Sequence, residues 1–387
     1  MLLAPGPTAL AQAVAAAAPG AILRLTPGRY GPARLDKPLT LEGPAGAVVD
    51  AGGLGSALTV AAPGVVVRGL TFRGSGIVET DLDSGILATR EAEGLLVENS
   101  DVVDNLYGIS IQGAKRVVVR GNRIANRNDL WLNDRGNGIN IWDSTGSLFE
   151  NNRVVGGRDG LYIHTAHGNA IRGNRFENLR FAVHYMFANR NEVTDNHSVG
   201  NAVGLAIMYS TDLKVLRNTS ENDRDHGLMF HSSHRSEVAW NRIRNTADKC
   251  GFVYTSTHNS LHDNRFEGCE IGLHFTGGSE KNTLYNNAFV NNHTQVKYTG
   301  MVHYEWSRNG RGNYWSDNPA FDLNGDGLAD TAYRPNTLVD RVIWQYPLAK
   351  LLLSSPVMET LRFAQSRFPA LDPGGVVDSW PLMKPAE

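Results

Sequence analysis

Short runs of alternating apolar and polar residues repeat along the chain. Most runs begin with a glycine and continue as an alternating tetrapeptide such as GINI (138–141) or GLAI (204–207), and Ala182 replaces the glycine once. The first and third positions after the glycine are apolar, so alternation places them in an interior and turns the second and fourth outward. This pattern predicts short β-strands and shows no helical period.

Asparagine repeats with the same period. Residues 1–98 contain no asparagine, whereas later ones recur at intervals of 22 or 23 residues, with one interval of 30. The recurring positions are Asn99, Asn122, Asn152, Asn174, Asn196, Asn218, Asn241, Asn264 and Asn287. Units of this length, built from strands, predict an all-β right-handed parallel β-helix. Asparagine side chains stacked at one bend would hydrogen-bond along the stack and satisfy buried polar groups there.

The segments around the repeats predict four regions. A short helix over residues 8–20 is expected to cover the open end of the solenoid. Two short helices that break at Pro356 are expected over residues 346–369. The regions are an N-terminal cap (1–20), the β-helix (21–305), a C-terminal cap (306–345) and a helical and extended tail for partner docking (346–387).

The single interval of 30 residues predicts a loop. The excess lies around residues 127–137, between the ladder positions Asn122 and Asn152. A stack of equal coils cannot absorb the additional residues, so we expect this segment to leave the stack and expose Trp131.

Composition excludes several classes of protein. With 37 basic and 39 acidic side chains, the chain lacks the positive charge of a nucleic-acid-binding protein. No apolar run reaches the roughly 18 residues of a membrane-spanning helix. No secretion signal is visible at the start, which is the pattern of a precursor trimmed to its mature form. Cys250 and Cys269 fall in adjacent coils at different offsets from their asparagines; a disulfide stays open, and we expect two buried thiols.

Histidine and methionine gather at the outward strand positions. Over four successive coils they occupy six of eight such positions, although the two types number only 19 of 387 residues. The eight positions are Tyr162, His164, His184, Met186, Ala206, Met208, Met229 and His231. The same rule gives Val253 and Thr255 in the next coil and His274 in the one after.

Imidazole and thioether groups are soft ligands that suit Cu(I), and no Asp or Glu occupies these outward positions. The pattern therefore predicts a site that binds Cu(I) transiently. The predicted main ligands are His184, Met186, Met208, Met229 and His231, with His164 and His274 peripheral. The alternative is an exposed methionine and aromatic surface on which a partner protein docks, and the two interpretations are compatible.

A second motif lies at residues 321–330, FDLNGDGLAD. Its alternate oxygen-bearing residues resemble the first half of an EF-hand loop, with a glycine at the sharp bend. The predicted ligands of a structural Ca²⁺ are Asp322, Asn324, Asp326, Leu328 and Asp330. Tyr333 replaces the bidentate glutamate at the twelfth position. The alternative is a turn that binds no metal.

Enzymatic activity is weakly indicated. Proton-abstracting enzymes on this fold need clustered acidic and basic side chains. Here Asp159, Glu177, Asp195 and Asp225 are scattered and fall mostly in turns, where we expect solvated capping roles. We therefore expect no enzyme, with a polysaccharide lyase or uronate epimerase as the alternative.

Several sequence strings together resemble the NosD family. They are GNYWSD (312–317), the acidic loop above, YRPNTLVDR (333–341), YPLAKLLLSSP (346–356) and GVVDSWPLMKP (375–385). The resemblance covers essentially the whole chain. It implies a periplasmic protein of denitrification that acts with an ABC transporter (ATPase NosF and permease NosY). It also implies cooperation with the copper chaperone NosL in assembling the copper centres of nitrous oxide reductase, with copper relayed to the reductase and sulfur as a second candidate cargo. It supplies no catalytic residues.

Overall fold

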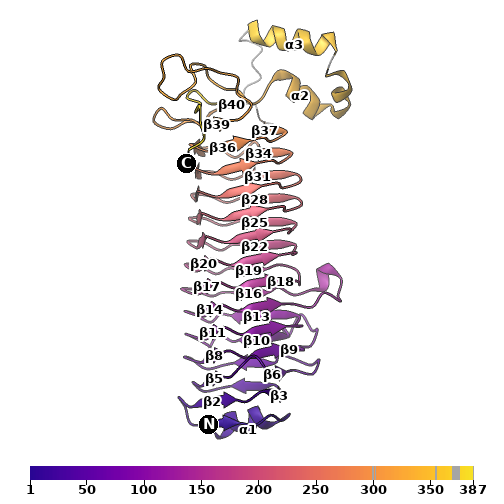
Figure 1. The fold of residues 1–387 in the computed structure, drawn as a ribbon, viewed down its shortest axis with the longest axis vertical. Coiled ribbons are helices and arrows are strands. Elements are labelled where there is room, and N and C mark those ends of the chain that lie inside the picture. Colours follow the sequence, from indigo (N-terminus) through magenta and orange to yellow (C-terminus); the bar gives the residue numbers. More distant parts are fainter. Residues whose placement is uncertain (299, 301, 354, 368–374, 387) are drawn as a thin grey trace. The chain divides into compact units, whose positions relative to one another are not determined.

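The computed structural model describes residues 1–386 apart from 299, 301, 354 and 368–374 (Figure 1). The fold is the all-β, right-handed parallel β-solenoid that the repeats predict, with about 14 turns. The chain divides into two compact units, Met1–Asp225 and His226–Glu387.

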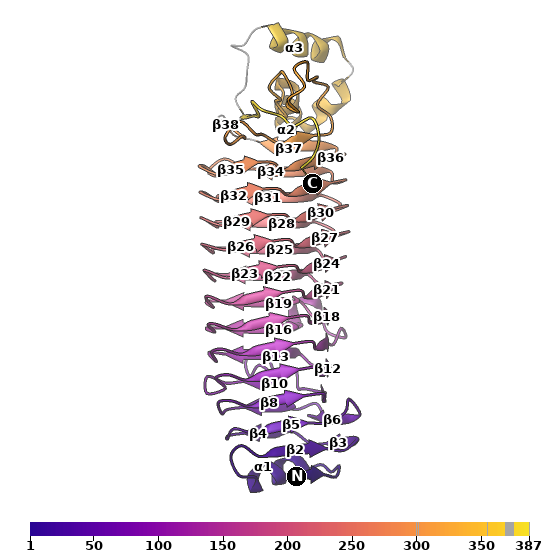
Figure 2. The ribbon, with the colours of Figure 1, turned by 60° about the vertical axis from the view of Figure 1, so that its left-hand side comes forward.

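In the first unit every coil contributes one strand to each of three parallel sheets (Figure 2). Sheet 1 contains β1 (Leu2–Leu3), β2 (Ile22–Leu25), β5 (Thr40–Glu42), β8 (Val66–Arg68), β11 (Leu96–Glu98), β14 (Val118–Arg120), β17 (Leu148–Glu150), β20 (Ala170–Arg172), β23 (Glu192–Thr194) and β26 (Lys214–Leu216). Sheet 2 contains β4 (Ala33–Leu35), β7 (Leu58–Val60), β10 (Ser84–Ala88), β13 (Tyr107–Gln112), β16 (Ile139–Trp142), β19 (Leu161–His164), β22 (Phe181–Met186) and β25 (Val203–Met208). Sheet 3 contains β3 (Gly28–Tyr30), β6 (Ala47–Asp50), β9 (Thr71–Arg73), β12 (Asp101–Val103), β15 (Arg123–Ala125), β18 (Arg153–Val155), β21 (Arg175–Glu177), β24 (His197–Val199) and β27 (Thr219–Glu221).

The second unit repeats this arrangement. Its sheet 1 contains β29 (Glu237–Ala239), β32 (Ser260–His262) and β35 (Thr283–Tyr285). Its sheet 2 contains β28 (His226–His231), β31 (Lys249–Tyr254), β34 (Ile271–Phe275) and β37 (Thr294–Tyr298). Its sheet 3 contains β30 (Arg242–Arg244), β33 (Arg265–Glu267), β36 (Ala288–Val290) and β39 (Tyr314–Trp315), and a separate pair contains β38 (His303–Glu305) and β40 (Gly375–Val377).

Close packing requires the glycine that comes before sheet 2 strands such as β16 and β19. A Cβ at Gly138 would lie 2.3 Å from Val154 Cγ1, and one at Gly160 would lie 2.6 Å from the carbonyl oxygen of Ala182. The apolar positions that follow, such as Ile139 and Ile141, are fully buried, as alternation predicts. Short coils thus fill their interior with alternate side chains and leave the other side of sheet 2 for chemistry.

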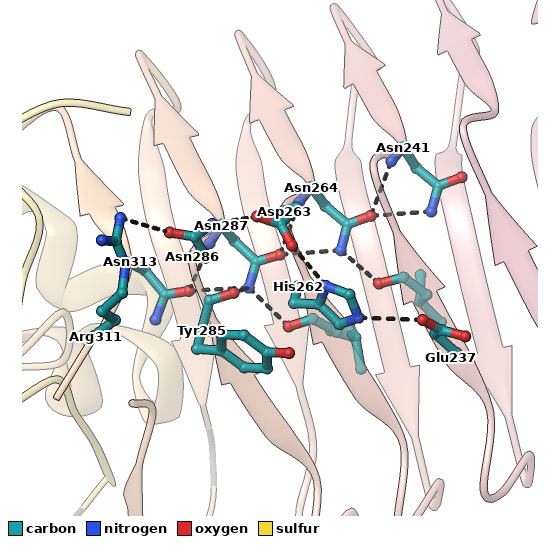
Figure 3. Close-up of polar contacts among 12 residues, drawn as sticks. Glu237, Asn241, His262, Asp263, Asn264, Tyr285, Asn286, Asn287, Arg311 and Asn313 are labelled. Atoms are coloured by element: carbon teal, nitrogen blue, oxygen red, sulfur yellow. Dashed lines mark hydrogen bonds and ion pairs between the residues drawn. The ribbon is translucent and has the colours of Figure 1, made fainter. Parts of the chain in front are cut away.

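The asparagine ladder is confirmed in both units. In the first unit Asn174 Nδ2 donates to Asn196 Oδ1 at 3.0 Å and to the carbonyl oxygen of Phe149 at 2.9 Å. In the second unit the same bonds connect Asn241, Asn264, Asn287 and Asn313 (Figure 3). Each buried amide therefore satisfies both its own polar groups and the backbone of the bend.

The prediction that Asn99 belongs to the ladder is wrong. Asn99 is exposed in a left-handed conformation (φ 49°), and the buried residue beside it is Ser100. The backbone N–H of Ser100 donates to Asn122 Oδ1 at 3.0 Å. An asparagine one residue away keeps the sequence period but lies at the left-handed position, which asparagine also favours.

The two expected irregular features of the first unit are present. Helix α1 (Ala9–Ala16) follows Thr8 and buries Leu10 and Val14. The long coil contains the 3₁₀ turn η1 (Leu132–Asp134), and Trp131 is 85% exposed.

The C-terminal region contains α2 (Leu338–Gln345), the 3₁₀ helix η2 (Pro347–Leu352) and α3 (Pro356–Arg367). Helix α2 begins at a capping box formed by Thr337 and Asp340, which the sequence analysis did not identify. Helix α3 begins at the expected Pro356, and the predicted helical residues 368 and 369 lie outside the described part of the chain.

The final strand closes the second unit. β40 pairs with β38, and the buried carboxylate of Asp378 accepts bonds from Asn313 N (2.6 Å) and Trp315 Nε1 (2.8 Å). Burial raises the pKa of Asp378 to about 6. Residues 375–382 therefore belong to the cap of the asparagine ladder, although the sequence analysis grouped them with a docking tail.

The cysteine prediction is wrong. Cys250 and Cys269 form a disulfide whose Cα atoms are 5.7 Å apart. Cys250 is the second residue of the sheet 2 strand β31, and Cys269 lies in the turn after β33 of the next coil. The two offsets differ along the sequence, but stacking brings the positions to bonding distance.

Candidate functional site

The outward face of sheet 2 in the first unit places three predicted ligands in one column. His164 pairs with Met186 in the next coil, and Met186 pairs with Met208 in the one after. Paired residues on neighbouring parallel strands are about 4.8 Å apart, so side chains of this length can contact a common ion. All three side chains are half-buried. His164 was predicted to be peripheral, but its register places it directly beside Met186.

His184 lies two residues before Met186 on the same face, above a buried carboxylate. Its Nδ1 is 2.9 Å from Asp159 Oδ2, and the same carboxylate accepts two bonds from Arg180, at 2.7 and 2.6 Å. Asp159 is 0% exposed. The expectation that Asp159 is a solvated turn residue is therefore wrong. No acidic residue occupies the outward positions themselves, but this buried carboxylate adjoins one of them.

The carboxylate fixes the chemistry of His184. With Nδ1 bonded to Asp159, the lone pair of a neutral imidazole is on Nε2, which is the atom available to an ion. Burial raises the pKa of Asp159, but bonds from His184 and Arg180 outweigh burial and hold that pKa below its ordinary value. A carboxylate behind a histidine is the usual arrangement around metal-binding imidazoles.

The position of Asp159 depends on two glycines. Gly156 and Gly157 have φ values of 73° and 82°, which side-chain-bearing residues rarely adopt. A Cβ at Gly157 would also lie 2.8 Å from the carbonyl oxygen of Gly136. This tight approach directs residues 158 and 159 toward the base of sheet 2. The consecutive glycines at 156 and 157 were the feature of the sequence from which the position of Asp159 could have been predicted.

Aromatic side chains border the column. Phe187 stacks on Tyr209 with ring centroids 5.1 Å apart, and His164 meets Phe187 edge-on at 5.7 Å. Phe187 and Tyr209 have positive φ and are exposed. Burial lowers the pKa of His164, with a smaller contribution from His184, so the imidazole is neutral and able to bind a cation. The surface thus has the features of both a soft metal site and a docking patch.

The remaining copper candidates lie in the second unit, in a different environment. Met229 pairs with Phe252, and His231 pairs with Tyr254, whose ring lies 4.9 Å from the imidazole. His274 pairs with the other side of Phe252. The prediction that His184, Met186 and Met208 share one ion with Met229 and His231 spans both units and stays a prediction.

The expected register of one coil is wrong. Val253 is 2% exposed and belongs to the core, and the outward positions of that coil are Phe252 and Tyr254. Cys250, the disulfide cysteine, occupies the place of the usual glycine, and Gly251 occupies the first interior position, opposite Leu228. Because the glycine of this coil, Gly251, lies one residue later than in the other coils, the predicted outward positions were shifted by one residue.

The acidic loop folds around its own backbone. The Asp322 carboxylate accepts the N–H groups of Gly325 (2.6 Å) and Gly327 (2.8 Å), and Asp326 Oδ1 accepts that of Leu328 (2.8 Å). Asp330 Oδ2 accepts the N–H of Leu323 at 2.9 Å, and Asn324 Nδ2 donates to Asp326. These bonds form an Asx-rich turn, and calcium binding there stays a prediction.

The described residues contain no group of three or more His, Cys, Asp or Glu side chains that could hold a metal ion. A copper site on this face therefore depends on methionine sulfur. Within the same residues, no helix is long and apolar enough to cross a membrane.

The carboxylates weighed for catalysis are engaged elsewhere. Glu177 bonds to Arg153, and Asp195 bonds to Arg217 at 2.8 Å. Asp225 is exposed, and the buried Asp159 is bonded to Arg180 and His184. The structure thus does not bring these four acidic groups together in one groove.

Comparison with known proteins identifies the family. A family model described as "NosD: Periplasmic copper-binding protein" matches residues 126–320. The probable ABC transporter binding protein NosD of Stutzerimonas stutzeri is 39% identical over 376 residues, which cover 93% of this chain and 86% of the relative. The chain belongs to the NosD family. The Pseudomonas aeruginosa protein of the same name is 40% identical over 93% of this chain and 87% of its own length.

Solved structures with a similar backbone show the fold alone. The surface adhesin PfbA of Streptococcus pneumoniae has a TM-score of 0.55 at 11% identity and covers 72% of this chain and 85% of its own. A polygalacturonase from Erwinia carotovora ssp. carotovora has a TM-score of 0.50 at 13% identity, covering 76% and 90%. An adhesin and a hydrolase share this backbone, so function must be argued from side chains.

Proposed function

We propose that this NosD-family chain is a non-enzymatic periplasmic protein that binds Cu(I) transiently and passes it onward during assembly of the copper centres of nitrous oxide reductase. The observation that carries the proposal is His184, oriented by the buried Asp159 beside the column of His164, Met186 and Met208. Imidazole and thioether ligands without thiolate give a site that holds Cu(I) and releases it to a stronger acceptor.

The proposed partners follow from the family and from exposed apolar surface. The named relatives are ABC transporter binding proteins, so the partners would be the permease NosY and ATPase NosF, with NosL as copper donor. The C-terminal helical region offers a docking surface, because Leu348, Leu351 and Phe363 are all well exposed. Phe187 and Tyr209 offer a second surface beside the copper column, where a partner could add its own ligand during transfer.

The test is anaerobic competition for Cu(I) against a chromophoric chelator. Met186→Leu combined with Met208→Leu keeps apolar volume and removes two sulfur ligands. We expect Cu(I) retention to fall about tenfold or more. Met383→Leu is the matched control, since this methionine lies in the C-terminal cap, and it should bind as the parent does.

Two further variants locate the site. His184→Gln should weaken Cu(I) binding, whereas Met229→Leu tests whether the second unit contributes a ligand. Reductase maturation by each variant is then measured in a reconstituted system. If the double leucine variant retains Cu(I) like the parent and matures the reductase fully, the surface is a docking patch and the copper proposal fails.

A further inference from the structure

A cleft of about 470 Å³ lies on the sheet 2 face of the first unit, where His164 and His184 line it but Met186 and Met208 do not. Its floor is formed by outward residues of β13, β16, β19 and β22, which Figure 2 shows stacked in order. Its walls come from two loops that leave the stack: the segment containing Glu79 and Leu82, and the long loop that ends at Asn137. The volume suits an organic molecule of one or two rings rather than a small inorganic ion.

One cation in this cleft lacks a counter-charge. The charge of Arg180 is matched by Asp159, which binds it through two bonds. Arg158 forms no ion pair with any carboxylate in the described part of the chain. Its Nε is buried without a hydrogen-bond partner, and its Nη1 makes only a 3.4 Å bond to the carbonyl oxygen of Asn133. This half-buried guanidinium therefore lacks the paired acceptor that an arginine normally has.

The other lining groups combine aromatic faces with amides. Tyr107, Trp142 and Tyr162 supply apolar area with polar edges, and Trp142 is 45% exposed. Gln112 supplies a half-buried side-chain amide, and the side-chain oxygen of the buried Asn137 has no partner. The amide of Asn140 is bonded to Asn137 and Ser110. A polyhydroxylated ring needs the same combination, because its hydroxyls donate and accept while its C–H faces are apolar.

We propose that this cleft binds an acidic sugar, with the sugar carboxylate on Arg158, the hydroxyls on the amides and the ring against the aromatic side chains. The site is a binding site only. Asp159 is occupied by Arg180 and His184, and Glu79 accepts from Tyr107 at 3.4 Å. The cleft borders the copper column, because His164 and His184 line it whereas Met186 and Met208 do not. The residue that carries the sugar proposal is Arg158, which is not among the proposed copper ligands.

The test is titration calorimetry on the full chain with a copper chelator present. Galacturonate and N-acetylmuramate are compared because both carry a carboxylate on a pyranose ring but come from different polymers. Galactose lacks the carboxylate, and acetate lacks the ring. We expect at least one of the acidic sugars to bind, with galactose and acetate weaker by about tenfold or more.

The variants separate this site from the copper column. Arg158→Gln should weaken binding of the acidic sugar about tenfold or more, whereas Arg190→Gln, an exposed arginine outside the cleft, should not change it. Arg158→Gln should retain Cu(I) as the parent does. The proposal is overturned by no binding up to about 10 mM, by equal binding of galactose or acetate, or by unchanged affinity of Arg158→Gln. None of these results bears on the copper assay.

Discussion

The two units use the same strand register on sheet 2 and reach opposite electrostatic arrangements. In the first unit Asp159 precedes β19 in the position that faces Phe181, three residues before His184 in the next coil. In the second unit Lys249 occupies the corresponding position, because it pairs with Ile271, three residues before His274. One histidine therefore lies above a buried carboxylate and the other lies beside an ammonium group.

The consequence is a difference in what each imidazole can do. Burial, followed by Lys297 and Lys249, lowers the pKa of His274 to about 4, and its Nδ1 is buried without a partner. Its ring packs on Phe252 at 5.0 Å. His184 instead has Nδ1 bonded to Asp159. Both imidazole rings contact aromatic neighbours, so the comparison teaches that the residue one coil below determines whether Nδ1 of an outward histidine has a hydrogen-bond partner.

The largest expected effect on stability comes from removing the negative charge of Asp159. Asp159→Asn removes a buried charge that binds two groups, and we expect a loss of about 3–5 kcal/mol in the free energy of unfolding, measured by chemical denaturation. The exposed pair made by Asp195 is the control, and Asp195→Asn should change stability by less than about 1 kcal/mol. An Asp159→Asn protein as stable as its parent, with unchanged Cu(I) retention, would remove the distinction between the units.

The asparagine ladder is present in each unit, so removing one of its side chains should lower stability by a similar amount in both. Asn196→Leu and Asn264→Leu each remove a ladder amide and leave backbone groups unpaired, so each should lower stability by about 1–3 kcal/mol in thermal and chemical denaturation. Asn178→Gly is the control, because Asn178 is an exposed residue with φ 57° that glycine tolerates. Unchanged stability in both leucine variants would contradict the ladder's role.

The smallest effect concerns the second unit. Lys249→Met removes one positive charge near His274, so the imidazolium is less disfavoured and the pKa of His274 should rise. Burial is the main cause of the low pKa, so the new value should stay below 6.5. NMR titration measures the shift, with the exposed Lys281→Met as control. Because a lowered histidine pKa weakens the folded state as pH falls from about 6.5 to 4, Lys249→Met should lessen that loss. A fall in the pKa of His274 would show that Lys249 does not act on it by charge.

The coils were predictable because their causes are local and repeated. Glycine before each strand, alternate apolar residues and one asparagine per coil recur in the sequence, and each reports a packing requirement that every coil must meet. Errors arose where a residue of the expected type stands one position away, as at Asn99 and Gly251. At these two places Ser100 occupies the buried position expected for asparagine, and Cys250 occupies the position expected for glycine.

The sequence by itself therefore determined the solenoid, its period, the projecting loop and the face on which histidine and methionine gather. Tertiary structure alone decided which side chains meet between coils. Asp159 is 25 residues before His184, Cys250 is 19 residues before Cys269, and Asp378 is 65 residues after Asn313. Such contacts depend on how coils of slightly different length stack, and a one-residue difference moves a side chain to the opposite face of its strand.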